Sequence, residues 1–192
     1  MAQATLEKSQ MAESPRRMSW DEFLCMDMGE LRRWEWVDGE VIEPMPAQFR
    51  HNTLAGFLYI LLALYADKFN MGQVFGEFMM KLVSRPSGRV PDVSFLHINN
   101  VGLLKNSFVN GPMDLAVEII SPESDERDRV DKFAEYEQGG VREYWLLDHF
   151  QREAFFYQLD AQGNYQRVLP DKTGRYDSVV LPGFWLNVNW LW

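Results

Sequence analysis

The sequence predicts a single mixed α/β (α+β) domain. A long helical pattern is followed by three strand patterns, a second helix and a fourth strand, an order typical of helices packed on a mixed sheet. With 192 residues, 46% hydrophobic and 14% aromatic, the chain is long enough to bury one full core. No internal repeat and no linker divides it. We therefore expect one domain over residues 18–192, preceded by a flexible arm, residues 1–17, which is polar and mixes both charge signs.

The N-terminal part of the domain is expected to form a short helix and a hairpin. Ser19 and Glu22 have the spacing of a capping box, which predicts a helix that ends near Met28. The strand patterns 33–37 and 40–42 then flank Asp38-Gly39, a pair suited to the positive φ angles of a two-residue turn.

The centre of the chain carries the main helix and three strands. Apolar residues recur at helical spacing from His51 to about Phe69, so we expect this helix to cover one face of the sheet. Residues 73–83 are rich in β-forming residues and predict the first strand. Residues 85–88 predict a turn into the second strand, 90–95, and a third strand follows at 115–120.

The remaining elements follow from helix and turn signals. Pro122 and several acidic residues predict a helix start, with the helix running from about residue 125 to 137 and ending at Gly139-Gly140. Residues 143–148 predict the fourth core strand. The rest of the chain, which includes the stretch 178–184, is expected to form hairpins appended to that core.

Composition excludes several classes of protein. The single cysteine, Cys25, excludes an internal disulfide framework and favours a reducing, cytoplasmic location. The three histidines, His51, His97 and His149, are too far apart for a local zinc site. The most apolar window, residues 53–66, is shorter than the roughly 20 residues of a membrane helix, so no membrane partner is expected.

The negative net charge of the chain means that any contact with nucleic acid requires a local basic patch. The net charge of −9 and pI of about 4.8 argue against a broad basic surface. Phosphate contact needs only a local patch, however. Five basic residues are candidates for such a patch, the alternative being that they are ordinary solvated charges: Arg85, Arg89, Lys105, Arg127 and Arg129.

Two acidic residues lie in segments that otherwise predict buried strands. Asp92 follows Val90-Pro91, and Glu118 lies within the apolar run 115–120. An unpaired buried carboxylate costs several kcal/mol, so a folded protein keeps one only with a cation, a hydrogen-bond partner or a raised pKa. Two such carboxylates on neighbouring strands indicate a divalent metal with oxygen ligands. The alternative is a pair of strand residues hydrogen-bonded to their neighbours.

Several ordered sequence blocks resemble one family. WEWVDGE, His51, VPDVSF, LAVEIISPES, Asp128, Lys132, Tyr136 and GVREYWLLD together resemble the Uma2 family, formerly DUF820, of the PD-(D/E)XK nuclease superfamily. The resemblance covers roughly residues 18–190. It implies a restriction-endonuclease-like core, α-β-β-β-α-β, with added N-terminal and C-terminal hairpins. It also implies a metal, Mg²⁺ with Mn²⁺ as a substitute, held by Asp92 and Glu118.

The resemblance also implies roles for other residues. The superfamily lysine expected two residues after the glutamate is replaced by Ile120, and Uma2-like sequences supply it from the next helix, which points to Lys132. The alternative for Lys132 is an exposed ion pair with Asp128. Glu35 matches a further acidic position near the metal, or else is an alternating polar residue of an exposed hairpin.

Two further residues of the resemblance have open roles. His51 is a candidate catalytic residue that faces the site, or else a helix cap or satisfied core residue. Tyr136 is expected to orient Lys132, to contact a phosphate or, as the preferred interpretation, to pack in the core.

The function implied by these residues is a Mg²⁺-dependent endonuclease acting on phosphodiester bonds, with nucleic acid, DNA above RNA, as its partner. The alternative is a catalytically weak or inactive nuclease-fold protein that binds nucleic acid or has a regulatory role.

We expect the C-terminal aromatic residues to be structural, because no basic residues are interleaved with them. The alternative is that they form a homodimer interface. These residues are Phe184, Trp185, Trp190 and Trp192. Lys132→Met is expected to abolish cleavage and to leave the fold nearly intact.

Overall fold

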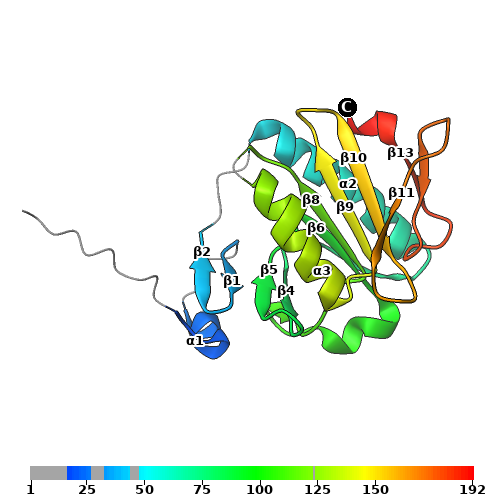
Figure 1. Cartoon of the computed structure of the whole chain (residues 1–192). Coiled ribbons are helices and arrows are strands. Elements are labelled where there is room, and N and C mark those ends of the chain that lie inside the picture. Colours follow the sequence, from blue (N-terminus) through cyan, green and yellow to red (C-terminus); the bar gives the residue numbers. More distant parts are fainter. Residues whose placement is uncertain (1–16, 27–32, 44–47, 123) are drawn as a thin grey trace, which may run out of the picture.

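A computed structural model describes residues 17–26, 33–43, 48–122 and 124–192. It contains two mixed sheets with helices around them (Figure 1). The expected arm, residues 1–17, lies outside the described residues except for Arg17, and so does Met28. No helix in the described part is long and apolar enough to cross a membrane.

The larger sheet forms the centre of the fold. Its six strands lie in the order β11-β10-β9-β8-β6-β3, and only the β8–β9 pair is parallel. The bounds are β3 (Gly72–Gly76), β6 (Val93–His97), β8 (Leu115–Ile119), β9 (Glu143–Asp148), β10 (Glu153–Leu159) and β11 (Tyr165–Val168). The parallel pair is joined by a helical crossover, as this connection requires. The expected core order is therefore present, as α2, β3, β6, β8, α3 and β9.

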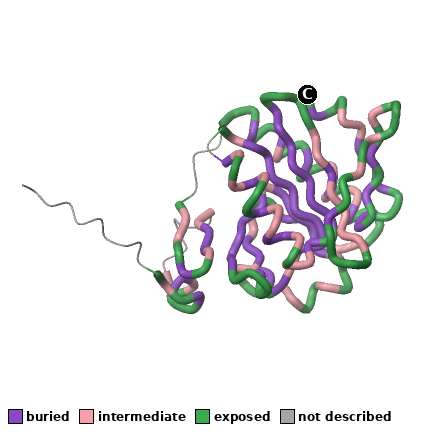
Figure 2. The backbone as a smooth tube through the Cα atoms, viewed as in Figure 1, coloured by how far each residue is buried: buried purple, intermediate pink, exposed green. Residues whose placement is uncertain are grey.

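The two faces of this sheet are covered by different helices. α2 (Phe49–Lys68) lies behind the sheet in Figure 1, and its buried side contributes Leu54, Leu58 and Leu62 to the largest apolar cluster. A π-helical segment, η2 (Arg127–Lys132), continues directly into α3 (Phe133–Gly139) on the front face. The strands between these helices are the most buried part of the backbone (Figure 2). This burial explains why α2 and β9 were predictable from their apolar patterns.

A smaller sheet packs beside the central one. Its five strands are ordered β2-β1-β5-β4-β7, with only β4–β7 parallel. The bounds are β1 (Glu35–Val37), β2 (Glu40–Ile42), β4 (Met79–Leu82), β5 (Ser87–Arg89) and β7 (Phe108–Val109). α1 (Trp20–Cys25) rests on this sheet through Trp20, whose ring leaves no room for a side chain at Gly88, where a Cβ would lie 2.5 Å away.

Several local predictions are confirmed. The capping box of Ser19 and Glu22 is present at α1. The turn between β1 and β2 uses Asp38 and Gly39 with φ of 45° and 90°, the conformation of a tight two-residue hairpin. The helix before β9 ends at Gly140, whose φ is 86°.

Other boundaries were predicted wrongly. Residues 73–83 form two strands in different sheets, β3 and β4, because the chain turns at Glu77, which has a φ of 50°. The turn expected at 85–88 lies at 83–86, and Ser87 and Gly88 belong to β5. Asp92 lies just before β6, not inside it.

The C-terminal part also differs from the expected appended hairpins. β10 and β11 extend the central sheet, since β10 pairs with β9 along six residues. Only β12 (Arg175–Asp177) and β13 (Trp185–Asn187) form a separate hairpin, and the stretch 178–184 connects them. Two 3-10 helices complete the described elements, η1 (Ile98–Leu103) and η3 (Val188–Leu191).

Candidate active site

All five candidate site residues line one small cleft of about 80 Å³. The cleft lies where β1, the entrance to β6, the end of β8, the start of α2 and η2 meet, beside the hairpin β1–β2 in Figure 1. The candidates that the structure brings together are Glu35, His51, Asp92, Glu118 and Lys132. At roughly 30 Å³ per water, the cleft has room for two or three water molecules or a partly hydrated ion.

The pairing of β6 with β8 places Asp92 beside Glu118. These strands are antiparallel with Val93 opposite Val117, so the preceding residue on one strand meets the following residue on the other. The backbone N–H of Ile119 donates to Asp92 Oδ2 at 2.7 Å, which fixes that carboxylate at the edge of the sheet.

Glu118 is almost fully buried and both of its oxygens have partners. The Tyr136 hydroxyl donates to Oε1 at 2.6 Å, and Lys132 Nζ lies 2.9 Å from Oε2. Burial and the nearby carboxylates of Asp128, Asp92 and Glu35 raise the pKa of Glu118 to about 8, although the charge of Lys132 opposes them. Burial is therefore the main reason that the pKa of Glu118 is raised, and the neighbouring carboxylates add to it.

Lys132 is buried among three carboxylates. Its Nζ lies 2.9 Å from Glu118, 3.2 Å from Asp128 and 3.4 Å from Glu35. Burial alone would lower the pKa of Lys132, but these charges outweigh burial and raise it. The exposed ion pair considered from the sequence is wrong, because the contact with Asp128 exists but only 5% of Lys132 is exposed.

Glu35 is also buried, so the exposed-hairpin alternative is wrong. It accepts from Arg89 Nη1 at 2.8 Å and from the backbone N–H of Val90 at 3.1 Å. Burial would raise the pKa of Glu35, but the charges of Lys132 and Arg89 lower it to about 2. Arg89 in turn donates from Nε and Nη2 to both oxygens of Glu135, each at 2.8 Å.

His51 faces the cleft from the first turn of α2. It does not cap the helix, whose N-cap is Gln48. His51 Nε2 lies 3.1 Å from Asp92 Oδ2, whereas Nδ1 is buried with no hydrogen-bond partner among the described residues. Burial would lower the pKa of His51, but the hydrogen bond and charge of Asp92 raise it.

Tyr136 has the preferred one of its expected roles, core packing, and a contact with Glu118 that was not expected. It is fully buried, with its ring edge-to-face against Tyr144 at 5.2 Å, so core packing is confirmed. Its hydroxyl orients Glu118, not Lys132, and complete burial rules out direct phosphate contact in this conformation.

Among the lining residues of the cleft that were not predicted as site residues, two bear most directly on its chemistry. Asp128 is buried, faces Lys132, and could have been found from its position four residues earlier on the same helix face. Arg127 lines the cleft with its Nε buried and unpaired among the described residues, and no sequence signal distinguishes it from the other arginines.

The five basic residues proposed as a phosphate patch do not gather on one surface. Arg89 is buried, Arg129 pairs with Asp125 and Asp148, and Lys105 lines a separate hollow beside Trp20. Arg85 and Arg127 line a common hollow, which buried Arg89 also borders, together with acidic side chains such as Asp131 and Glu135.

The donor set fits a lightly ligated divalent cation. Within the described residues, no group of three or more His, Cys, Asp or Glu side chains is arranged to hold a metal. Asp92 Oδ1 accepts no hydrogen bond within the described part of the chain, and Glu118 lies beside it in a cluster of mutually repelling carboxylates. Mg²⁺ is commonly held by one or two carboxylates, with waters and substrate oxygens completing its coordination, so Asp92 and Glu118 suffice.

Comparison with known proteins gives the family and the fold. A crystal structure of "a putative nuclease belonging to DUF820" from Anabaena variabilis ATCC 29413 superposes with a TM-score of 0.73 at 20% sequence identity, covering 91% of this chain and 97% of that one. No curated protein matches. Residues 20–189 match the Uma2 family, described as "Putative restriction endonuclease". The chain therefore belongs to the Uma2 family.

Proposed function

We propose that the protein is a Mg²⁺-dependent endonuclease, with Mn²⁺ as a substitute metal, that hydrolyses phosphodiester bonds in DNA. The observation that carries this proposal is the convergence of Asp92, Glu118 and Lys132 in one cleft. Family membership supports nuclease activity; the metal and the substrate are inferred from the chemistry of the cleft.

Different side chains of the cleft would have different roles in phosphodiester hydrolysis. A divalent cation held by Asp92 and Glu118 would act as a Lewis acid on the phosphate and lower the pKa of a bound water. The ammonium of Lys132, held by Glu118, would position the attacking water and offset charge that develops on the phosphate. The guanidinium of Arg127, which lines the cleft, would donate to a non-bridging phosphate oxygen.

His51 and Glu35 act through their neighbours. His51 holds Asp92 Oδ2, so it orients that carboxylate and neutralises part of its charge. Glu35 accepts from Arg89 and lies 3.4 Å from Lys132 Nζ, so it helps Glu118 to hold the ammonium in place. The site is thereby preorganised before substrate binds, which electrostatic catalysis requires.

The experiment is a cleavage assay on supercoiled plasmid, linear duplex, single-stranded DNA and RNA, with Mg²⁺, Mn²⁺ or EDTA. Asp92→Asn and Glu118→Gln should each lower the rate by about 10²–10³-fold, the range found when a key electrostatic group is removed. Asp114→Asn is the matched control, because Asp114 is a buried, hydrogen-bonded acid outside the cleft. Equal cleavage by wild type and the two site variants would show that the activity comes from elsewhere.

A second candidate is a nuclease-fold protein that binds nucleic acid without turnover. It is favoured by one observation, that Tyr136 and Lys132 already occupy both oxygens of Glu118. Binding of labelled DNA in Ca²⁺, combined with no cleavage of any substrate in Mg²⁺ or Mn²⁺, would support this candidate and reject the nuclease.

A further inference from the structure

The outer face of α2 carries large apolar side chains that remain exposed in the described structure. Phe49 is 84% exposed, Leu64 68%, Ile60 59% and Phe57 37%. Phe57, Ile60 and Leu64 are spaced by three and four residues, so they form one stripe along the helix. The stripe lies opposite the side of α2 that packs on the sheet.

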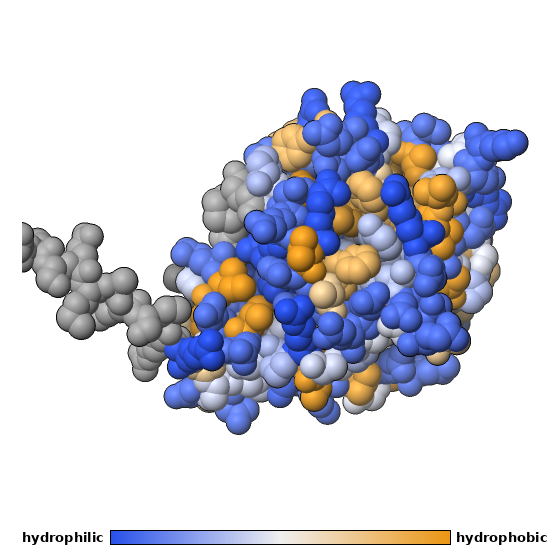
Figure 3. All heavy atoms as spheres, viewed as in Figure 1, coloured by the Kyte–Doolittle hydropathy of each residue, from blue (hydrophilic) through white to orange (hydrophobic). Residues whose placement is uncertain are grey.

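The C-terminal tryptophans extend this stripe into a wider surface. Trp190 and Trp192 border a hollow of about 470 Å³ together with Phe49 and Phe57. Trp190 also borders a second hollow, of about 320 Å³, together with Leu64. We call this surface the α2 face, and its members are Phe49, Phe57, Ile60, Leu64, Trp190 and Trp192. The opposite side of the molecule, where α3 lies, is mainly hydrophilic (Figure 3).

The area of the α2 face is close to one side of a standard protein interface. A large aromatic side chain has about 150–250 Å² to bury, and the exposed fractions of the six residues then amount to roughly 650 Å². A specific dimer buries about 800 Å² per partner, and flanking polar residues would supply the difference. Apolar patches of this size are uncommon on soluble monomers.

We propose that the α2 face binds a second copy of this chain across a two-fold axis, with the two α2 helices antiparallel. A two-fold interface requires a self-complementary surface. Pairing centred between Phe57 and Ile60 places Phe57 of one copy on Ile60 of the other. The same pairing places Arg50 opposite Asp67 of the second copy. Neither residue forms an ion pair with any residue in the described ranges.

Charge also favours this arrangement over a random contact between copies. The chain has a net charge of −9, so two copies repel each other in general. Neither hollow beside the α2 face is lined by a carboxylate among the described residues, and Arg50, Arg152 and Lys68 border them instead. The face is therefore where two copies can approach with the least repulsion.

Nucleic acid is the competing occupant, because Arg50, Arg152 and His149 line the larger hollow. The fold brings these basic residues next to the aromatic residues of the α2 face, although the two kinds of residue are not interleaved in the sequence. Bases stack on aromatic rings, however, and would leave the aliphatic Ile60 and Leu64 exposed. A second copy covers both the aromatic and the aliphatic part.

The first test measures the mass of the full chain by sedimentation velocity, in EDTA, over about 1–100 µM protein. Wild type should be a dimer. Leu64→Glu should weaken dimerisation at least about 100-fold, because it places a charge within the apolar stripe. Leu169→Glu is the matched control, since Leu169 is 70% exposed and lies outside the α2 face, and it should leave the dimer unchanged. Circular dichroism confirms that both variants fold.

The second test is a charge swap that checks the antiparallel register. Arg50→Glu and Asp67→Arg should each weaken the dimer about tenfold, and the double variant should return to near wild-type affinity. A wild-type monomer at every concentration would overturn the proposal. So would a Leu64→Glu dimer as tight as wild type, or a charge swap that restores nothing. A monomer whose tryptophan emission is quenched by an oligonucleotide would assign the face to nucleic acid instead. None of these results depends on cleavage, so they stand apart from the proposed nuclease activity.

Discussion

Replacing Lys132 by methionine should destabilise the whole domain, which differs from the expectation drawn from the sequence. Methionine keeps most of the length of the side chain, all but the terminal nitrogen, and removes its charge. Lys132 is buried and lies within 3.4 Å of three carboxylates, Glu35, Glu118 and Asp128. Loss of one partner from a buried ion pair costs about 3–5 kcal/mol, because the remaining charge stays buried and uncompensated. For a domain of this size the loss corresponds to roughly 6–20 °C in Tm.

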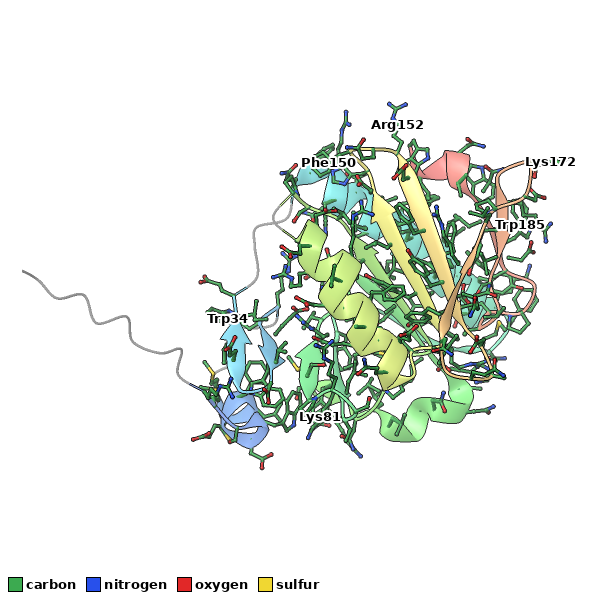
Figure 4. The ribbon with its side chains drawn as sticks, in the orientation of Figure 1. Trp34, Lys81, Phe150, Arg152, Lys172 and Trp185 are labelled. Carbon is green, nitrogen blue, oxygen red and sulfur yellow. The ribbon has the colours of Figure 1, made fainter. Side chains whose placement is uncertain are left out.

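The assay is urea unfolding monitored by tryptophan fluorescence, in EDTA at neutral pH. Lys172→Met is the control, because Lys172 is an exposed lysine at the right-hand edge of the molecule in Figure 4, and it should change stability by less than about 0.5 kcal/mol. Adding Asp128→Asn to Lys132→Met should recover part of the loss, since one of the uncompensated charges is then removed.

One result would refute this reasoning. If Lys132→Met unfolds within about 1 kcal/mol of Lys172→Met, the three carboxylates do not depend on the ammonium for their burial. Loss of cleavage in Lys132→Met is informative only under conditions where the variant is shown to be folded.

Three other predictions follow from contacts outside that ion cluster. Tyr136→Phe should destabilise by about 1.5–3 kcal/mol, as it leaves Glu118 Oε1 without its donor; Tyr144→Phe, which loses a bond to a neutral carbonyl, should cost less in the same unfolding assay. Burial and nearby positive charge lower the pKa of His149, so its protonation opposes folding. As pH falls from about 6.5 to 5, the stability of wild type should therefore fall relative to that of His149→Gln, which lacks this group. Truncation after Pro182 removes three buried core side chains and should lower Tm by at least about 10 °C; an unchanged Tm in calorimetry would contradict a structural role for the C-terminus.

Local signals predicted the elements whose cause is local. The φ angles of Asp38 and Gly39 follow from what those residues tolerate, and the end of α3 follows from Gly140. α2 was predictable because its buried side has helical spacing, and β9 because all six of its residues are buried. None of these required knowledge of distant partners.

The predictions that were wrong concern features that depend on tertiary partners. Residues 73–83 have uniform β propensity, and nothing in their composition shows that β3 pairs with β6 while β4 pairs with β5. The burial of Glu35 was equally hidden, because it depends on Arg89, 54 residues away in the chain. A charged residue in a hairpin is exposed by default, and only its partner makes burial tolerable.

The C-terminal aromatic residues show that the exposure of an apolar side chain is as hard to predict from sequence as the burial of a charged one. Phe184 is buried in the main core, as packing predicts, but Trp185, Trp190 and Trp192 remain 38–47% exposed. In Figure 4, Trp185 lies on the outer side of the molecule, away from Phe150 and Arg152. Sequence predicts that an aromatic residue buries area, but not whether its own chain or a second chain provides the partner.

Ile120, at the position where the sequence resemblance led us to expect a lysine, links the candidate site to the packing of α3. Residues two apart on a strand share a face, and Ile120 belongs to the apolar cluster beneath the helix. The ammonium near Glu118 therefore comes from the layer above the sheet, through Lys132, and not from the strand itself. Tyr136, one turn further along, reaches the same carboxylate from the same helix. Glu118 thus has its charge partner only when η2 and α3 are docked, so any local unfolding of this helix removes both of its contacts at once. If the lysine were on the same strand as Glu118, the sheet alone would hold the two side chains together. Here the contacts that Glu118 makes with Lys132 and Tyr136 form and break together with the docking of the helix on the sheet.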